Sequence, residues 1–102
     1  MVYEIASVEI APGKDGEARE WAREIHEYGM KKFGFKGQLL VQVTPAPGQG
    51  GRITWISIHD SLASWGEVLG KMHEDAGWLK RTKSHLETRV PSTFARTVYR
   101  TV

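Results

Sequence analysis

Segments with strand-like alternation and segments with helical spacing follow one another in an order that few folds accept. The apolar pattern predicts strands over 2–10, 38–44, 52–59 and 93–102, helices over 16–33 and 61–72, and, after a break at 75–77, a short third helix through Leu86. This β-α-β-β-α-β order is the ferredoxin-like split arrangement, in which an antiparallel four-stranded sheet carries its helices on one face. A chain of 102 residues supplies one hydrophobic core, so we expect a single α+β domain over 1–102.

Turn and capping residues mark where these elements begin and end. Asp15 follows a Pro-Gly turn and is placed to cap the first helix, and Gly34 follows its last apolar residue. Either Asp60 or Ser61 ends the third strand and caps the second helix. The second and third strands are joined by the Pro- and Gly-rich loop 45–51, so we expect a hairpin whose mobile tip could serve as a lid.

Apolar residues occur at both alternations of the predicted central strands. Neighbouring side chains of a strand point to opposite faces of its sheet. One face therefore receives Leu39, Val41 and Val43, and the other receives Leu40, Ile56 and Ile58. Because the helices cover only one face, the other must meet water or a partner. We expect a second copy of the sheet to cover it, which makes the protein a homodimeric, dimeric α+β barrel.

Two stretches carry a family resemblance that covers nearly the whole chain. They are IAPGK, after the first strand, and HDSLASWGEVLGKMHEDAGW, which runs from the end of the third strand through the second helix. With them the sequence resembles the dimeric α+β barrel superfamily, most closely NIPSNAP-like and antibiotic-biosynthesis-monooxygenase-like small proteins. The resemblance implies the fold and a homodimer. The superfamily includes cofactor-free monooxygenases acting on aromatic polyketides, haem-degrading enzymes, isomerases and many members of unknown activity. The Asn-Trp-Tyr and Asn-Trp-His sets of its monooxygenase branches are not recognisable in this sequence.

The composition excludes several classes of function. The chain has no cysteine, so it has no disulfide, no thiolate metal site and no cysteine nucleophile. Its four histidines show neither H-x-H nor H-x-x-x-H spacing, so no metal and no cofactor are expected. The net charge is only +2, and the basic residues are scattered among Glu. We therefore expect no basic surface of the kind that binds nucleic acid. No signal-peptide pattern and no apolar stretch of ~18 residues occurs, so we expect a cytoplasmic protein without membrane contact.

Two histidines are candidates for proton transfer. His59 shares its strand alternation with Trp55, whereas Asp60 points to the opposite face, which argues against a Ser-His-Asp triad. His85 falls on one helical stripe with Trp78, so we expect it to point inward. An inward histidine beside tryptophan and hydroxyl groups could act as a general base, although a hydrogen-bonded core histidine is the commoner case.

Aromatic residues are abundant enough to wall a ligand pocket. The chain has four tryptophans, and Trp21, Trp65 and Trp78 fall on inward helical stripes. They serve as core, as pocket walls between helices and sheet, or as both. On the last strand, alternation predicts that the side chains of Arg96 and Tyr99 point to opposite faces of the sheet. Arg96 on an inward face would anchor an anion, although a position at the rim or in solvent is favoured.

The leading hypothesis is a homodimeric α+β barrel that binds a small apolar or aromatic molecule between its helices and its sheet. The expected site residues are Trp55, Trp65, Trp78, Arg96 and Tyr99 as ligand contacts, with His59 and His85 as candidate catalytic residues. A second hypothesis is a cofactor-independent monooxygenase or isomerase with an aromatic substrate, in which a histidine moves a proton and Arg96 or Tyr99 holds an oxyanion. A third hypothesis is a haem-binding protein with one histidine as axial ligand, and a fourth is an oligomerisation module without a ligand.

Overall fold

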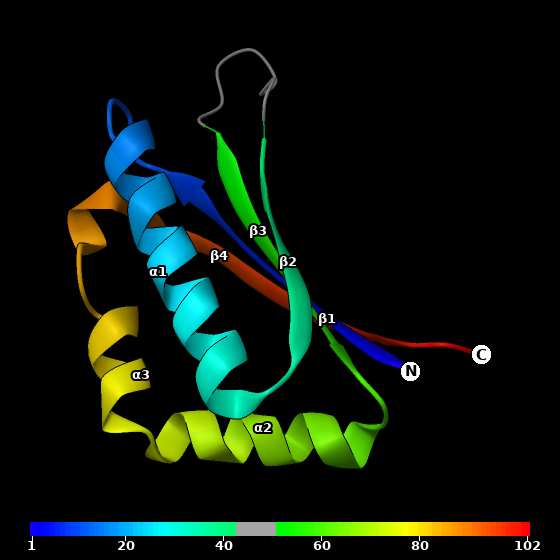
Figure 1. Cartoon of the computed structure of the whole chain (residues 1–102). Coiled ribbons are helices and arrows are strands. Elements are labelled where there is room, and N and C mark those ends of the chain that lie inside the picture. Colours follow the sequence, from blue (N-terminus) through cyan, green and yellow to red (C-terminus); the bar gives the residue numbers. More distant parts are fainter. Residues whose placement is uncertain (43–50) are drawn as a thin grey trace.

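The structure is a computed structural model that describes residues 1–42 and 51–102. In chain order its elements are β1 (Val2–Ile10), α1 (Asp15–Phe33), β2 (Lys36–Val41), β3 (Arg52–His59), α2 (Leu62–Glu74), α3 (Ala76–Thr82), the 3-10 helix η1 (Leu86–Thr88) and β4 (Arg89–Arg100) (Figure 1). The predicted α+β class and the β-α-β-β-α-β order are confirmed. Most of the predicted hairpin tip, residues 45–50, and the predicted end of the second strand lie outside the described residues.

The four strands form one antiparallel sheet in the order β2-β3-β1-β4. The predicted hairpin of the second and third strands is confirmed by the pairing of β2 with β3. β1 lies between β3 and β4, with Val2 opposite His59 on one side and Arg100 on the other. A bulge shifts the register of β1 against β4 between Ser7 and Glu9. The sheet thus brings the first and last strands of the chain side by side.

Helices lie on one side of the sheet. α1 runs along this covered face, α3 lies beside α1, and α2 crosses the end of the helical layer (Figure 1). The stripe predicted from helical spacing is the buried side of α1, as expected for an amphipathic helix on a sheet. The core under this helix consists of Ala18, Trp21, Ala22 and Ile25 from α1 and Val8, Ile10 and Ile53 from the sheet.

The opposite side of the sheet, here called the open face, is not covered by any described helix (Figure 1). Strand alternation places Ile5 and Ile58 there. Leu40 of β2 and Tyr99 of β4 share this face and are 48% and 55% exposed. Apolar side chains therefore lie on both faces of the sheet, as predicted.

The structure selects between the predicted helix caps. Ser61, and not Asp60, caps α2: its hydroxyl accepts a hydrogen bond from the Ser64 amide at 3.1 Å, and the Ser64 hydroxyl accepts one from the Ser61 amide at 3.0 Å. The prediction that Asp15 caps α1 is wrong, because the cap is Lys14 and has no side-chain hydrogen bond. Asp15 instead lies in the first turn, where its charge still favours the positive end of the helix dipole.

The third helix ends earlier than predicted. α3 stops at Thr82, and residues 83–85 form a turn before η1. His85 in this turn has a φ of 51°, in the left-handed region, which a right-handed helix cannot accommodate. The last strand begins at Arg89 rather than at position 93. The helical spacing that grouped His85 with Trp78 therefore does not hold in three dimensions.

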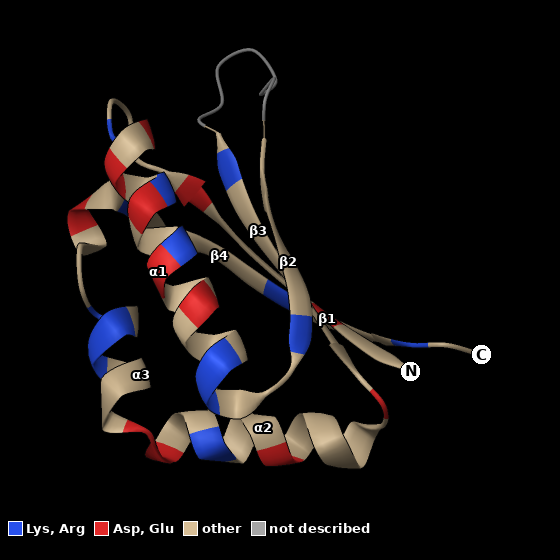
Figure 2. Cartoon of the chain, in the orientation of Figure 1, with Lys and Arg blue, Asp and Glu red and all other residues tan. Residues whose placement is uncertain are grey.

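Charged residues of both signs are mixed over the exposed side of α1 (Figure 2). Two such pairs, Lys14 with Glu17 and Arg23 with Glu20, lie three residues apart at 3.7 and 3.1 Å. This mixture agrees with a solvated helix face. No helix among the described residues has both the length and the apolar character needed to cross a membrane.

Candidate functional site

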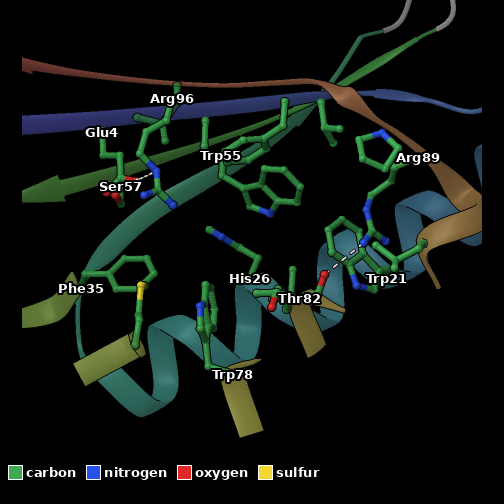
Figure 3. A pocket seen from close by; sticks show the side chains of 18 residues that line it. Glu4, Trp21, His26, Phe35, Trp55, Ser57, Trp78, Thr82, Arg89 and Arg96 are labelled. Atoms are coloured by element: carbon green, nitrogen blue, oxygen red, sulfur yellow. Dashed lines mark hydrogen bonds and ion pairs between the residues drawn. The ribbon is translucent and has the colours of Figure 1, made fainter. Parts of the chain in front are cut away.

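A cavity of about 370 Å³ lies between the helices and the covered face of the sheet (Figure 3). Its larger apolar lining residues are Trp21, Ile25, Phe35, Trp55, Met72, Trp78, Leu86 and Phe94. Its polar lining residues are Glu4, His26, Ser57, Thr82, Arg89 and Arg96. A mostly apolar cavity with a few polar groups, in the range of about 300–1,000 Å³, is typical of sites for small molecules.

One wall of the cavity is a pair of tryptophans from different elements. Trp21 of α1 and Trp55 of β3 meet edge to face, with ring centroids 5.5 Å apart. The indole N–H of Trp21 donates a 2.9 Å hydrogen bond to the carbonyl of Arg81. The guanidinium of Arg89 stacks on Trp21, with its Cζ 3.4 Å from the ring centroid. These contacts fix the orientation of both rings, so this wall is preformed.

A second wall is Trp78, which α3 carries across the cavity from Trp55 (Figure 3). Its ring packs edge to face on Phe33 at 5.7 Å. Asp75 caps α3 by accepting a 2.7 Å hydrogen bond from the Trp78 amide, and the same carboxylate accepts one from the Tyr28 hydroxyl. Since Tyr28 belongs to α1, Asp75 ties the start of α3 to α1 and thereby positions the Trp78 wall.

The polar end of the cavity is built around Glu4. The Nε of Arg96 on β4 lies 2.7 Å from the Glu4 Oε1 (Figure 3). The indole N–H of Trp65 on α2 donates a 2.7 Å hydrogen bond to the Glu4 Oε2. The Glu4 side chain is 14% exposed and that of Arg96 is 43% exposed. Both oxygens of Glu4 are therefore engaged, and Arg96 lies where the cavity meets solvent.

His26 of α1 is a candidate functional residue that the sequence pattern did not select. Its position at the border of a helical stripe predicts a surface or half-buried side chain, and the structure confirms that it is half-buried. It points into the cavity toward Arg96 (Figure 3). Burial lowers the pKa of His26 below 6.5, against the opposing effect of the Glu27 carboxylate. The ring is therefore mostly uncharged at neutral pH. No residue in the described ranges forms a hydrogen bond with it, so both ring nitrogens are available to a ligand.

His59 lies behind the lining of the cavity. The strand register confirms that it shares a face with Trp55 and Ser57. It is 6% exposed, its Nε2 lies 3.1 Å from the Ser57 hydroxyl, and its ring packs on Phe35 at 5.8 Å. Burial lowers the pKa of His59 below 6.5. Because Ser57 lines the cavity and His59 does not, His59 is placed to orient the Ser57 hydroxyl.

The remaining residues expected at the site fall into three groups: residues that line the cavity, one that supports the lining, and two that do neither. Trp55, Trp78 and Arg96 line the cavity. Arg96 lies on the covered face and its side chain is also 43% exposed, so the solvent exposure favoured for it is found where the cavity meets solvent. Trp65 supports the lining from behind through its hydrogen bond to Glu4.

His85 and Tyr99 do not line the cavity. The inward orientation expected for His85 is wrong: its side chain is 60% exposed, because the chain leaves helical geometry before reaching it. Tyr99 pairs with Tyr3 and lies on the open face, because alternation along β4 separates it from Arg96. Neither residue shares a space with the other expected site residues.

The arrangement combines aromatic walls with an uncharged imidazole, a hydroxyl and a guanidinium. No group of three or more His, Asp or Glu side chains that could hold a metal ion occurs in residues 1–42 and 51–102. The walls suit a planar apolar molecule, the polar groups suit an oxygen-bearing substituent, and His26 is placed for proton transfer.

Comparisons with known proteins relate the chain to others through its fold. No protein-family model and no curated protein sequence matches it. An uncharacterised NIPSNAP domain protein from Burkholderia xenovorans superposes with a TM-score of 0.72 at 12% identity, covering 100% of this chain and 95% of that one. A NIPSNAP family protein of unknown function from Agrobacterium tumefaciens gives a TM-score of 0.71 at 17% identity, covering 97% and 86%.

The same fold occurs in a cofactor-independent oxygenase, SnoaB from Streptomyces nogalater, with a TM-score of 0.68 at 11% identity over 98% of this chain and 91% of that one. The chain therefore has the fold that NIPSNAP proteins share with antibiotic-biosynthesis-monooxygenase-like proteins, as the sequence resemblance implies. At these identities the likeness concerns the fold, and function has to be inferred from the site.

Proposed function

We propose that this protein binds a small aromatic molecule in the cavity between α1, α3 and the sheet. The observation that carries this proposal is that Trp21, Trp55 and Trp78, from three separate elements, face one space of about 370 Å³. Protein interiors are packed with few voids larger than a water molecule, and an unfilled cavity lowers stability. A space of this size that is lined by fixed rings and a few polar groups therefore favours a binding site over a core.

The test is to fill the cavity from the sheet. Ala6 lines it from β1, and Ala6→Phe places a ring inside it. Ala63→Phe is the matched control, because Ala63 is exposed on α2. With 1-naphthylacetamide as a neutral aromatic probe, titration calorimetry is expected to show binding to the wild type and to Ala63→Phe, and none to Ala6→Phe. No binding to the wild type, or equal binding to a folded Ala6→Phe variant, would overturn the proposal.

We also infer that a second copy of the chain covers the open face. Leu40 and Tyr99 are exposed there together with the apolar side chains of Ile5 and Ile58 on the same face. Burying apolar surface contributes about 25 cal/mol per Å². A second copy presents the same face, so two open faces packed together bury both, as in the dimeric α+β barrel that the sequence resemblance implies.

Sedimentation velocity tests this inference. The wild type is expected to sediment as a dimer and Ile58→Asp as a monomer, because the substitution introduces a charge into the open face. Leu62→Asp is the control, since Leu62 is 47% exposed on α2 and does not belong to that face. A monomeric wild type at micromolar concentration would contradict the inference.

One observation favours a catalytic variant of the same site. His26 offers an uncharged imidazole inside an aromatic cavity, which suits it to take a proton from a phenol or a carbon acid. The fold is also that of a cofactor-independent oxygenase. Oxygen uptake with an anthrone tests this candidate: the wild type is expected to accelerate uptake over the protein-free reaction, and His26→Gln is expected to abolish the acceleration. No acceleration by the wild type would contradict the catalytic role and leave ligand binding as the proposed function.

A further inference from the structure

Resting on the proposed binding of an aromatic molecule, we propose further that this molecule carries a carboxylate, that Arg96 binds the carboxylate, and that His26 takes up a proton as the complex forms. The polar end of the cavity has three features that lead to this assignment. The terminal N–H groups of Arg96 donate no hydrogen bond within the described residues, and both carboxylate oxygens of Glu4 already have partners. His26 faces Arg96 across the cavity (Figure 3).

Arg96 uses only part of its guanidinium within the protein. Its Nε forms the 2.7 Å ion pair with Glu4. Within the described part of the chain, neither of its terminal nitrogens donates a hydrogen bond. A guanidinium presents five N–H donors in a planar fork that matches the two oxygens of a carboxylate. The end of Arg96 that lies in the cavity is therefore a preformed group for a carboxylate.

Glu4 acts as a positioning residue for Arg96. Its two oxygens are held by the Arg96 Nε and the Trp65 indole, so it cannot swing away to pair with another group. A ligand carboxylate at Arg96 would then place two negative charges around one positive charge. In a partly desolvated site that excess is unfavourable, and one more positive charge nearby would offset it.

His26 can supply this positive charge. Burial keeps the pKa of His26 below 6.5, so the ring is mostly neutral at pH 7. A carboxylate bound beside it favours the protonated form and raises that pKa. The other titratable and charged groups around it are Glu27 from α1, Glu4 from β1, His59 behind Ser57 from β3, and Arg89 and Arg96 from β4. Arg89 is already committed to backbone carbonyls at 3.0–3.2 Å, so it does not provide the added charge.

The shape of the site suits a molecule with one charged end. Arg96 is 43% exposed, and Phe94, which also lines the cavity, is 50% exposed. A carboxylate at Arg96 keeps part of its hydration and avoids most of the cost of burying a charge. The aromatic body of the same molecule then extends inward to the tryptophan walls.

A matched pair of probes tests the carboxylate. 1-Naphthylacetate and 1-naphthylacetamide differ only in the end group, and calorimetry at pH 7 is expected to give the acid a Kd about tenfold or more below that of the amide. Arg96→Met is expected to remove this preference, so that the acid no longer binds more tightly than the amide. Arg100→Met, at an exposed position of the same strand that does not line the cavity, is expected to change neither. Equal affinities for acid and amide overturn the carboxylate proposal and leave the proposed function standing, whereas no binding of either probe overturns both.

Proton uptake tests His26. The acid is titrated at pH 7 in two buffers of different ionisation enthalpy, and the difference in heat gives the number of protons taken up. The wild type is expected to take up a fraction of a proton with the acid and none with the amide. His26→Gln is expected to bind the acid without uptake. Uptake that persists in His26→Gln, or none in the wild type, overturns the role of His26.

Discussion

Trp78 and Gly29 pack so closely that a Cβ atom at position 29 would lie 2.9 Å from the Trp78 Cζ3. The same Cβ would lie 3.2 Å from the Cζ of Phe35. Gly29 does not have a positive φ, so its role is to leave space rather than to permit an unusual backbone. α3 thus packs against α1 at Gly29. The position of Trp78, one wall of the cavity, requires that residue 29 has no side chain.

Substituting Gly29→Ala is expected to lower the free energy of unfolding by roughly 1 kcal/mol. Overpacking costs about 1–3 kcal/mol, and the better helix propensity of Ala offsets about 1 kcal/mol of it. The displaced indole should also weaken binding of 1-naphthylacetamide. Urea unfolding measures the first effect and calorimetry the second.

Two glycines of α2 provide the control for that substitution. A Cβ at Gly66 or Gly70 meets no atom within 4 Å, so alanine there is expected to stabilise by up to about 1 kcal/mol. A Gly29→Ala protein as stable as these two variants would show that the contact between Gly29 and Trp78 does not constrain the fold.

Trp65→Phe is expected to lower the free energy of unfolding by about 1–3 kcal/mol, because it removes a hydrogen bond to the half-buried Glu4 carboxylate. Trp55→Phe removes an indole N–H that lies 3.5 Å from the Ala22 carbonyl, so its hydrogen-bond loss should be smaller. Urea unfolding of the two variants compares these losses. Equal losses would mean that the bond between Trp65 and Glu4 contributes little.

Local periodicity is sufficient to predict the position of a residue that lies inside one regular element. Alternation along β3 places His59 with Trp55 and away from Asp60, and the structure confirms this grouping. Capping chemistry likewise identifies Ser61 as one of two candidates for the start of α2. Both predictions concern residues that are close to one another in the sequence, so the local pattern is enough to make them.

Periodicity fails where the chain changes its geometry or where a site combines several elements. Helical spacing groups His85 with Trp78, but a left-handed residue breaks that spacing. The pattern does not select His26, because a stripe border is ambiguous until the neighbouring strand and helix are placed. Its spacing of four residues from the buried Ala22 is the available signal. The ion pair between Glu4 and Arg96 joins the two ends of the chain, and only the sheet topology reveals it.

Asp75 is expected to stabilise the fold above its unfolded pKa of 3.8 and to lose this effect in acid. The Tyr28 hydroxyl and then the Trp78 amide lower its pKa in the folded state, with a smaller contribution from Lys32. A carboxyl whose pKa is depressed by folding contributes stability that disappears as pH falls through the folded pKa. The difference in unfolding free energy between wild type and Asp75→Asn should therefore be larger at pH 7 than at pH 3. A difference independent of pH would contradict this assignment.

His59 is expected to make the fold less stable as pH falls below 6.5. Its pKa is lowered in the folded state by burial, so the unfolded chain binds more protons between the folded pKa and 6.5. Stability is therefore full above pH 6.5 and declines through that window, by at most about 1.4 kcal/mol per pH unit for one group. His26 is shifted in the same direction, also by burial, and adds to the decline. Urea unfolding from pH 7.5 to 5 is expected to show a shallower slope of unfolding free energy against pH for His59→Gln than for the wild type. An unchanged slope for His59→Gln would mean that His59 is protonated as easily in the folded protein as in the unfolded chain.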